Sequence, residues 1–145
     1  MQHTAATLQA MAHFITRYGL HTGDQFAAPG PAAPMDICAV AYITAERCAP
    51  PPEFFTDEVT SLAIIESSAG AMAAIRAISE VLDSTVCETE IVPGTWVPDY
   101  IEHVSNWAAT ASPITPKRPP TIDEVIGRIL RAANTLATQT TPHAA

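Results

Sequence analysis

The chain has 145 residues, of which 48 % are hydrophobic and 15 % charged, and its formal net charge is −8 with a single lysine, Lys117. This length and composition fit one ordinary domain with a buried core, whereas intrinsic disorder needs lower hydrophobicity and higher charge. The acidic balance argues against a surface that follows nucleic-acid phosphates, and no apolar stretch reaches the ~18 residues of a membrane-spanning helix.

A first helix is predicted over residues 5–18. Thr4 is its expected N-cap, and Gly19 suits the left-handed position just past its end. Its apolar residues recur at helical spacing and therefore share one face: Leu8, Met11, Ala12, Ile15 and Tyr18. The Gly- and Pro-rich residues 19–34 show no periodicity and predict an irregular loop.

The second helix is predicted over residues 37–47, with Asp36 as its cap. Its apolar side chains point nearly all round the axis, which is typical of a helix packed against several neighbours, so we expect it to be the central element. The prolines at 50–52 then set the chain in an extended form, and Phe54 and Phe55 are expected to fill the edge of the core beyond them.

Residues 57–83 are helical in character, with a favourable start at Thr56 and acidic residues in the first turn. A Ser-Ser pair and Gly70 interrupt the middle of this stretch, where their helix propensity is poor. Two helices, over 57–67 and 70–83, and one kinked helix fit this pattern equally well.

The next segment is rich in β-favouring residues, and Pro93-Gly94 marks a turn in its middle. A short hairpin is therefore predicted near 85–97, although a lone two-stranded hairpin is only marginally stable. Pro98 fits the first position of the helix that follows. The apolar face of that helix is Tyr100, Ile101, Val104, Trp107 and Ala108.

The last helix has the clearest pattern in the chain. Thr121 and Glu124 form a capping box, in which a hydroxyl and a carboxylate satisfy each other's main-chain donors. Its apolar face is Ile122, Val125, Ile126, Ile129, Leu130, Ala133 and Leu136. Four prolines keep residues 111–120 in a loop before it, and the polar residues from Thr138 onward predict fraying.

These elements predict a single globular domain over 1–145. The expected fold is all-α, a compact bundle of five to six helices with at most one short β-hairpin near 85–97. The ends, about 1–4 and 138–145, are expected to fray.

Three cysteines, Cys38, Cys48 and Cys87, are spaced too widely for a CxxC zinc or redox motif. Their odd number, together with an N-terminus that lacks the pattern of a secretory leader, indicates free thiols in a reducing compartment. We therefore expect a cytoplasmic location.

Cys38 is the basis of the catalytic alternative. It lies near the start of the second helix, where the helix dipole lowers a thiol pKa, and His21 or His103 could approach it to form a Cys–His pair. Against this, no local signature surrounds Cys38, and the neighbouring Asp36 would raise its pKa. A buried structural cysteine is the interpretation that we favour.

Other candidate chemistry has weaker support. The histidines lack metal-ligand spacing, so nothing selects a site built from His21, Asp24 and His103, and we expect no metal and no cofactor. Glu88 and Glu90 alternate on the predicted hairpin. As paired carboxylates they could act as acid and base, but exposed acids on a solvated face are the simpler interpretation.

Trp96, Tyr100 and Trp107 are the densest group of large aromatic residues with a polar group. Trp and Tyr are enriched in binding hot spots, so these three are the candidate partner- or ligand-binding residues. Tyr100 and Trp107, seven residues apart, also match one helix face, and core packing is the simpler explanation of that spacing.

Three stretches carry a resemblance: Tyr18-Gly-Leu-His-Thr-Gly23, Ile37-Cys-Ala-Val-Ala41, and Trp107 followed by Thr121-Ile-Asp-Glu-Val-Ile126. Together they resemble a family of actinobacterial and phage proteins known only as a domain of unknown function. The high Ala content and the excess of Arg over Lys favour the same kind of source, a high-GC bacterium, its phage or a plasmid. The resemblance implies a host and a fold but no activity.

No catalytic constellation stands out, so we expect a small acidic accessory or interaction protein that is not an enzyme. Its expected partner is a protein or a second copy of the chain, with neither nucleic acid nor a membrane. One alternative is a cysteine-dependent hydrolase or transferase that uses Cys38 with a histidine. A second alternative is a binder of a small apolar ligand in the helical core.

Overall fold

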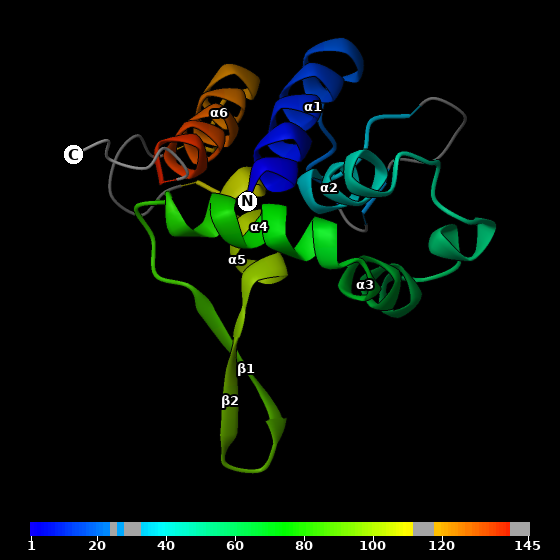
Figure 1. Cartoon of the computed structure of the whole chain (residues 1–145). Helices are drawn as coiled ribbons and strands as arrows, with labels where there is room; N and C mark the ends of the chain where they lie inside the picture. Colours follow the sequence, from blue (N-terminus) through cyan, green and yellow to red (C-terminus); the bar gives the residue numbers. More distant parts are fainter. Residues whose placement is uncertain (24–25, 28–32, 112–117, 140–145) are drawn as a thin grey trace.

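The computed structural model describes residues 1–23, 26–27, 33–111 and 118–139. In this part of the chain the structure contains six α-helices, one short 3-10 helix and one antiparallel hairpin, which confirms the expected mainly α fold. The elements in chain order are α1 (Gln2–Tyr18), α2 (Ile37–Glu46), η1 (Pro52–Phe55), α3 (Glu58–Ser67), α4 (Ala69–Glu80), β1 (Cys87–Val92), β2 (Thr95–Asp99), α5 (Tyr100–Ala109) and α6 (Ile122–Gln139). Figure 1 shows the helices gathered in one body from which the hairpin projects.

Two helices share the centre of the body. The first five residues of α2 are fully buried, as expected for a helix that is apolar all round, and α2 contacts α1, α3, α4 and α5. Helix α4 contacts those same helices and α6 as well. Small residues let the two approach closely, since a Cβ added at Gly70 of α4 would lie 3.1 Å from the Cβ of Ala45 in α2.

The two longest helices, α1 and α6, pack against each other beside this centre (Figure 1). Their buried residues are Leu8, Met11, Ala12, Ile15, Val125, Ile129, Ala132 and Ala133. The capping box of α6 is confirmed, because Glu124 accepts from the Thr121 N–H at 2.7 Å and the Thr121 hydroxyl accepts from the Glu124 N–H at 3.3 Å. Ile122 and Leu130, expected on the buried face, are exposed.

The N-terminal boundary of α1 differs from the prediction. The helix already begins at Gln2, because the Ala5 N–H donates to the Met1 carbonyl and adds a turn before Thr4, which is therefore no cap. Gly19 does follow the helix with a positive φ of 80°, but its ψ of −173° lies in a region that only glycine adopts readily and not in the left-handed helical region.

Helices α3 and α4 are separate elements that meet at Ser68 with a bend of 95°. The Ser68 main chain is extended, and its hydroxyl accepts from the Ala71 N–H at 3.1 Å and so caps α4. Among the described residues, no single helix is long and apolar enough to cross a membrane, and α3 and α4 meet that criterion only as this bent pair.

The segment between α2 and α3 places its two phenylalanines differently. Phe54 in η1 is buried, with its ring centroid 6.4 Å from those of Phe26 and Tyr42, which confirms its expected role at the edge of the core. Phe55 is 56 % exposed, so the same expectation is wrong for it. A short 3-10 turn has neighbouring side chains on different faces and buries only one of them.

Strands β1 and β2 pair antiparallel through Cys87–Asp99, Glu88–Pro98, Thr89–Val97 and Glu90–Trp96. The predicted turn at Pro93-Gly94 is confirmed; Gly94 has φ +82°, as the third residue of a type II turn requires. Pro98 lies in β2 and does not start the next helix, because Asp99 caps α5 by accepting from the Glu102 N–H at 2.9 Å.

Candidate functional site

Cys38 lies in the core at the second position of α2 and has no exposed surface. Its sulfur accepts from the Ser105 hydroxyl at 3.3 Å and lies 3.8 Å from the Ile101 carbonyl oxygen. Burial raises the pKa of this thiol well above its usual value, and the carboxylate of Asp36 raises it further. The thiol is therefore protonated and closed to solvent, which is the environment of a structural cysteine.

Asp36 caps α2 from inside the protein. Its Oδ1 accepts from the Cys38 N–H at 2.7 Å and from the Ser105 hydroxyl at 3.3 Å. Burial raises the pKa of Asp36 from its usual 3.8 to about 6, and these hydrogen bonds and the nearby His21 oppose that rise. The cluster of Asp36, Cys38 and Ser105 thus ties the start of α2 to α5.

His103 on α5 is hydrogen-bonded to two serines. Its Nδ1 lies 2.7 Å from the Ser79 hydroxyl oxygen, and its Nε2 lies 2.8 Å from that of Ser84. Burial lowers the pKa of His103 below its usual value, so the ring is neutral at pH 7, with one nitrogen donating and the other accepting. The serines occupy both nitrogens, and the structure does not join His103 to Cys38 by a hydrogen bond.

His21, the other candidate base, lies near the start of α2. Its main-chain N–H donates to the Met35 carbonyl at 2.9 Å, and its charge acts on Asp36. Asp24, which completes the metal site considered from the sequence, lies outside the described residues. Within the described ranges, no group of three or more His, Cys, Asp or Glu side chains is placed to hold a metal ion.

The three candidate aromatic residues are not one cluster. Trp96 on β2 is 57 % exposed, whereas Trp107 on α5 is half-buried and packs against the core. Tyr100, at the start of α5, lies between them in sequence and is also half-buried. The structure therefore brings Trp96 and Tyr100 to the hairpin region and places Trp107 in the packing of the helical body.

The tip of the hairpin exposes large apolar side chains. Ile91, Val92 and Trp96 are 58 %, 55 % and 57 % exposed, and they flank the Pro93-Gly94 turn. The strands project from the helical body (Figure 1), and all three side chains are more than half exposed among the described residues. An exposed apolar group of this kind is typical of a binding surface.

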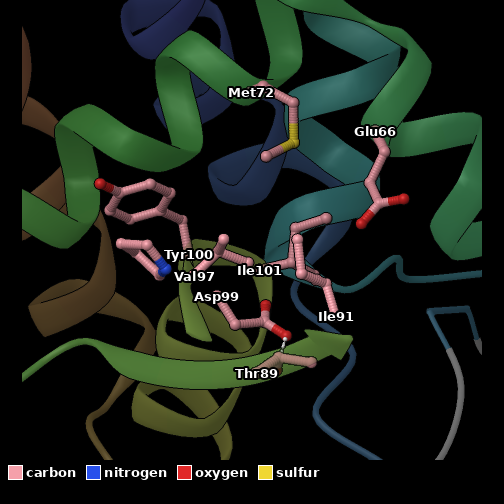
Figure 2. A pocket seen from close by; sticks show the side chains of 9 residues that line it. Glu66, Met72, Thr89, Ile91, Val97, Asp99, Tyr100 and Ile101 are labelled. Carbon is pink, nitrogen blue, oxygen red and sulfur yellow. Dashed lines mark hydrogen bonds between the residues drawn. The ribbon is translucent and has the colours of Figure 1, made fainter. Parts of the chain in front are cut away.

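A surface hollow of about 110 Å³ lies where the hairpin meets the helices. Its lining includes Ile91 and Val97 from the hairpin, Met72 from α4, and Tyr100 (Figure 2). Such a volume holds one or two side chains and is far below the ~300–1,000 Å³ of a small-molecule pocket.

Acidic side chains surround this apolar surface. Glu66 and Asp99 line the hollow, and Glu88 and Glu90 are exposed on β1. The Asp99 carboxylate accepts from the Thr89 hydroxyl at 2.8 Å, which steadies the hairpin where it joins α5 (Figure 2). Glu88 and Glu90, the paired carboxylates considered from the sequence, share one exposed face of β1, and Asp99 lies on the other face of the strand pair.

The hairpin is fixed to the body at its base. Arg128 on α6 donates to the Val81 carbonyl at 2.9 Å and forms an ion pair with Asp83. His103 holds Ser84, the next residue along the chain, at 2.8 Å. The loop before β1 is thus held by α5 and α6, which positions the exposed tip relative to the hollow.

Sequence reasoning missed several residues of this site, namely Glu66, Met72, Ile91, Val92 and Val97. The alternation of acidic and β-favouring residues in β1 is the signal that could have identified the strand faces. Glu66 and Met72 come from different helices, and only the bend at Ser68 brings them beside the hairpin.

Comparison of the chain with family models, with curated proteins and with solved structures finds no match. The resemblance to an uncharacterised actinobacterial and phage family therefore stays a prediction, and the geometry of this chain is the basis for assigning its function.

Proposed function

We propose that this chain is a non-enzymatic interaction protein that binds a protein partner through hairpin β1–β2 and the adjacent hollow. The observation that supports the proposal most strongly is the exposure of Ile91, Val92 and Trp96 at the hairpin tip. A two-stranded hairpin has little stability by itself, and burying these side chains against a partner removes apolar surface from water. Tryptophan is also among the most frequent hot-spot residues of interfaces.

The chemistry of Cys38 supports a binding role over the cysteine-dependent enzyme. Catalysis by a cysteine needs an accessible thiolate, whereas Cys38 is fully buried and its pKa is raised. All three cysteines are free, which accords with the reducing cytoplasm that we propose as the location.

Differential affinity capture from the native host tests the proposal. The immobilised chain is compared with Trp96→Ser and with a matched control, Val59→Ser, which removes an apolar side chain that is 77 % exposed on α3. We expect one protein to be retained by the native chain and by the control but lost with Trp96→Ser. Retention of the same proteins by all three forms would contradict binding through the hairpin.

A further inference from the structure

The outer edge of β1 offers free main-chain hydrogen-bonding groups. Because Pro98 has no N–H, the Glu88–Pro98 pair cannot exchange two hydrogen bonds, so the ladder bonds lie at the flanking pairs Cys87–Asp99 and Thr89–Val97. The N–H and C=O groups of Glu88 and Glu90 then point away from β2. Within the described residues the sheet has two strands, so no third strand pairs with this edge.

The two faces of the hairpin differ in chemistry. Thr89, Ile91 and Val97 face the hollow, where Val97 is half-buried. Glu88 and Glu90 alternate with them on β1 and therefore lie on the opposite, exposed face, which also carries Trp96, the cross-strand partner of Glu90. A strand added beside β1 would place alternate side chains against the face with Thr89, Ile91 and Val97 and against the face with the two glutamates and Trp96.

The charge around the hairpin has one sign. Residues 84–102 contain four carboxylates, Glu88, Glu90, Asp99 and Glu102, and no Lys or Arg, so this segment supplies half of the net charge of −8. Arg76, whose guanidinium lies over the ring of Tyr100 at the hollow, is paired with Glu80 at 3.1 Å. A partner that approaches β1 thus meets acidic groups.

We infer that the edge of β1 binds an extended segment of a partner protein in which basic residues alternate with apolar ones, and that this segment becomes a third strand. Its main chain pairs with Glu88 and Glu90, its apolar side chains lie beside Ile91 at the hollow, and its basic side chains lie beside the two glutamates. The inference rests on the proposed function and specifies the partner chemistry.

A second copy of this chain is disfavoured as the occupant. Symmetric antiparallel pairing of two β1 edges about Thr89 would set Glu88 of each copy opposite Glu90 of the other. Like charges directly opposite each other destabilise a strand pair, and the shared net charge of −8 adds to that repulsion.

The probe is a synthetic eight-residue peptide that alternates lysine with valine, carrying a fluorescent label. We expect the fluorescence anisotropy of the labelled peptide to rise to saturation as the native chain is added. The bound peptide should also slow hydrogen exchange at the N–H groups of Glu88 and Glu90. A peptide that alternates glutamate with valine should not bind. Equal binding of both peptides would overturn the basic partner.

Matched substitutions distinguish attraction of the peptide to the hairpin from attraction to the net charge of the whole protein. Glu88→Lys should weaken binding of the lysine–valine peptide at least roughly threefold, because an exposed attraction becomes a repulsion. Glu53→Lys makes the same change at an exposed site on η1 and should leave binding unchanged. Equal weakening by both substitutions would show attraction to the whole molecule and would overturn the inference.

Main-chain pairing is tested with N-methylated peptides. One version carries methyl groups on the amide nitrogens of the lysines and the other on those of the valines, so that only one of them blocks the edge facing β1. We expect one version to bind and the other to fail. If both bind equally, or if a hairpin-dependent dimer forms instead, strand addition by a basic segment is overturned.

Failure of the inference is distinguishable from failure of the proposed function. If the peptide does not bind while Trp96→Ser still abolishes capture of a partner, the hairpin is a docking element for a segment of another chemistry, and only the inference falls. If capture does not depend on Trp96, the proposed function falls and the inference falls with it.

Discussion

Asp36 links folding to protonation through burial of its carboxyl group. Its side chain is needed at the start of α2, where it accepts from the Cys38 N–H, yet that position is buried. Because its pKa is raised to about 6, the folded state binds the proton more tightly than the unfolded state does. The stability that this group contributes is fully present below pH 3.8 and is lost as the pH rises through about 6.

Asp36→Asn should therefore stabilise the protein at pH 7, because an amide oxygen still accepts both hydrogen bonds without the cost of a buried charge. The expected gain in the free energy of unfolding is roughly 1–3 kcal/mol, since each pKa unit corresponds to ~1.4 kcal/mol. Urea unfolding at pH 7 and at pH 4.5 measures it, and the gain should shrink at the lower pH.

Asp57→Asn is the matched control for that experiment. Asp57 caps α3 in the same way, accepting from the Thr60 N–H at 2.7 Å, but it is exposed and this hydrogen bond lowers its pKa. Because the pKa of Asp57 is lowered in the folded state, its ionised form stabilises the folded protein at pH 7. The substitution to Asn should therefore not stabilise the protein at that pH. A gain as large as that of Asp36→Asn would disprove the burial explanation.

The three free cysteines should differ in reactivity according to their surroundings. Iodoacetamide at pH 8 should modify the exposed Cys48 first and the half-buried Cys87, whose pKa is raised by burial, more slowly. Cys38 should react only when the protein unfolds. Mass spectrometry of timed samples, with and without urea, measures the three rates, and rapid native labelling of Cys38 would restore the enzymatic alternative.

Most helices could be predicted from the sequence because their signals are local. Periodicity and the Thr121–Glu124 box define α6, and the poor helix formers around Ser68 already indicated a break. A local pattern could not decide between a kink and two helices, because the 95° bend also depends on Ser68 bonding Glu46, which lies 22 residues earlier.

The candidate site was harder to predict because it depends on where elements meet. Trp96, Tyr100 and Trp107 lie close in sequence, but a strand and a helix carry them to different surroundings. Ser105, which bonds both Asp36 and Cys38, lies 67 residues after Cys38, and no spacing rule reaches that far. Exposure of the hairpin tip likewise follows from the way the hairpin projects from the described helices and not from strand propensity.

The stability of the domain should depend strongly on the buried face of α6. Ile129 is fully buried against α1, so Ile129→Asp should unfold the domain or cost several kcal/mol, because a buried unpaired charge has no compensating partner. Ile126→Asp should cost less, since Ile126 is only half-buried. Chemical denaturation followed by circular dichroism gives the three free energies, with Arg131→Asp on the exposed face expected to change stability by about 0.5 kcal/mol.

At the scale of the whole molecule, charge and shape distinguish the helical body from the hairpin. The helical body holds the buried polar clusters around Asp36 and His103, which join α2, α4 and α5. The hairpin carries exposed apolar side chains and three carboxylates, Glu88, Glu90 and Asp99, without Lys or Arg. Function is therefore expected at the projecting element, and stability in the body.

The net charge of −8 also predicts that the protein does not bind nucleic acid. Salt-dependent binding to a duplex requires several cationic contacts that release counterions, and this chain has seven Lys and Arg residues against fifteen acids. Fluorescence anisotropy with labelled duplex DNA should show no binding at 150 mM salt. Micromolar affinity that falls steeply with added salt would contradict this expectation.

Pro98 has a consequence for aggregation. Exposed apolar strands can nucleate fibres, and growth of a fibre requires that each sheet accept a neighbour on both sides. The outer edge of β2 cannot offer an N–H at Pro98, and the edge of β1 carries two charges that repel an identical strand. The hairpin can thus accept a foreign strand beside β1 while pairing with further copies of this chain is disfavoured at both of its own edges.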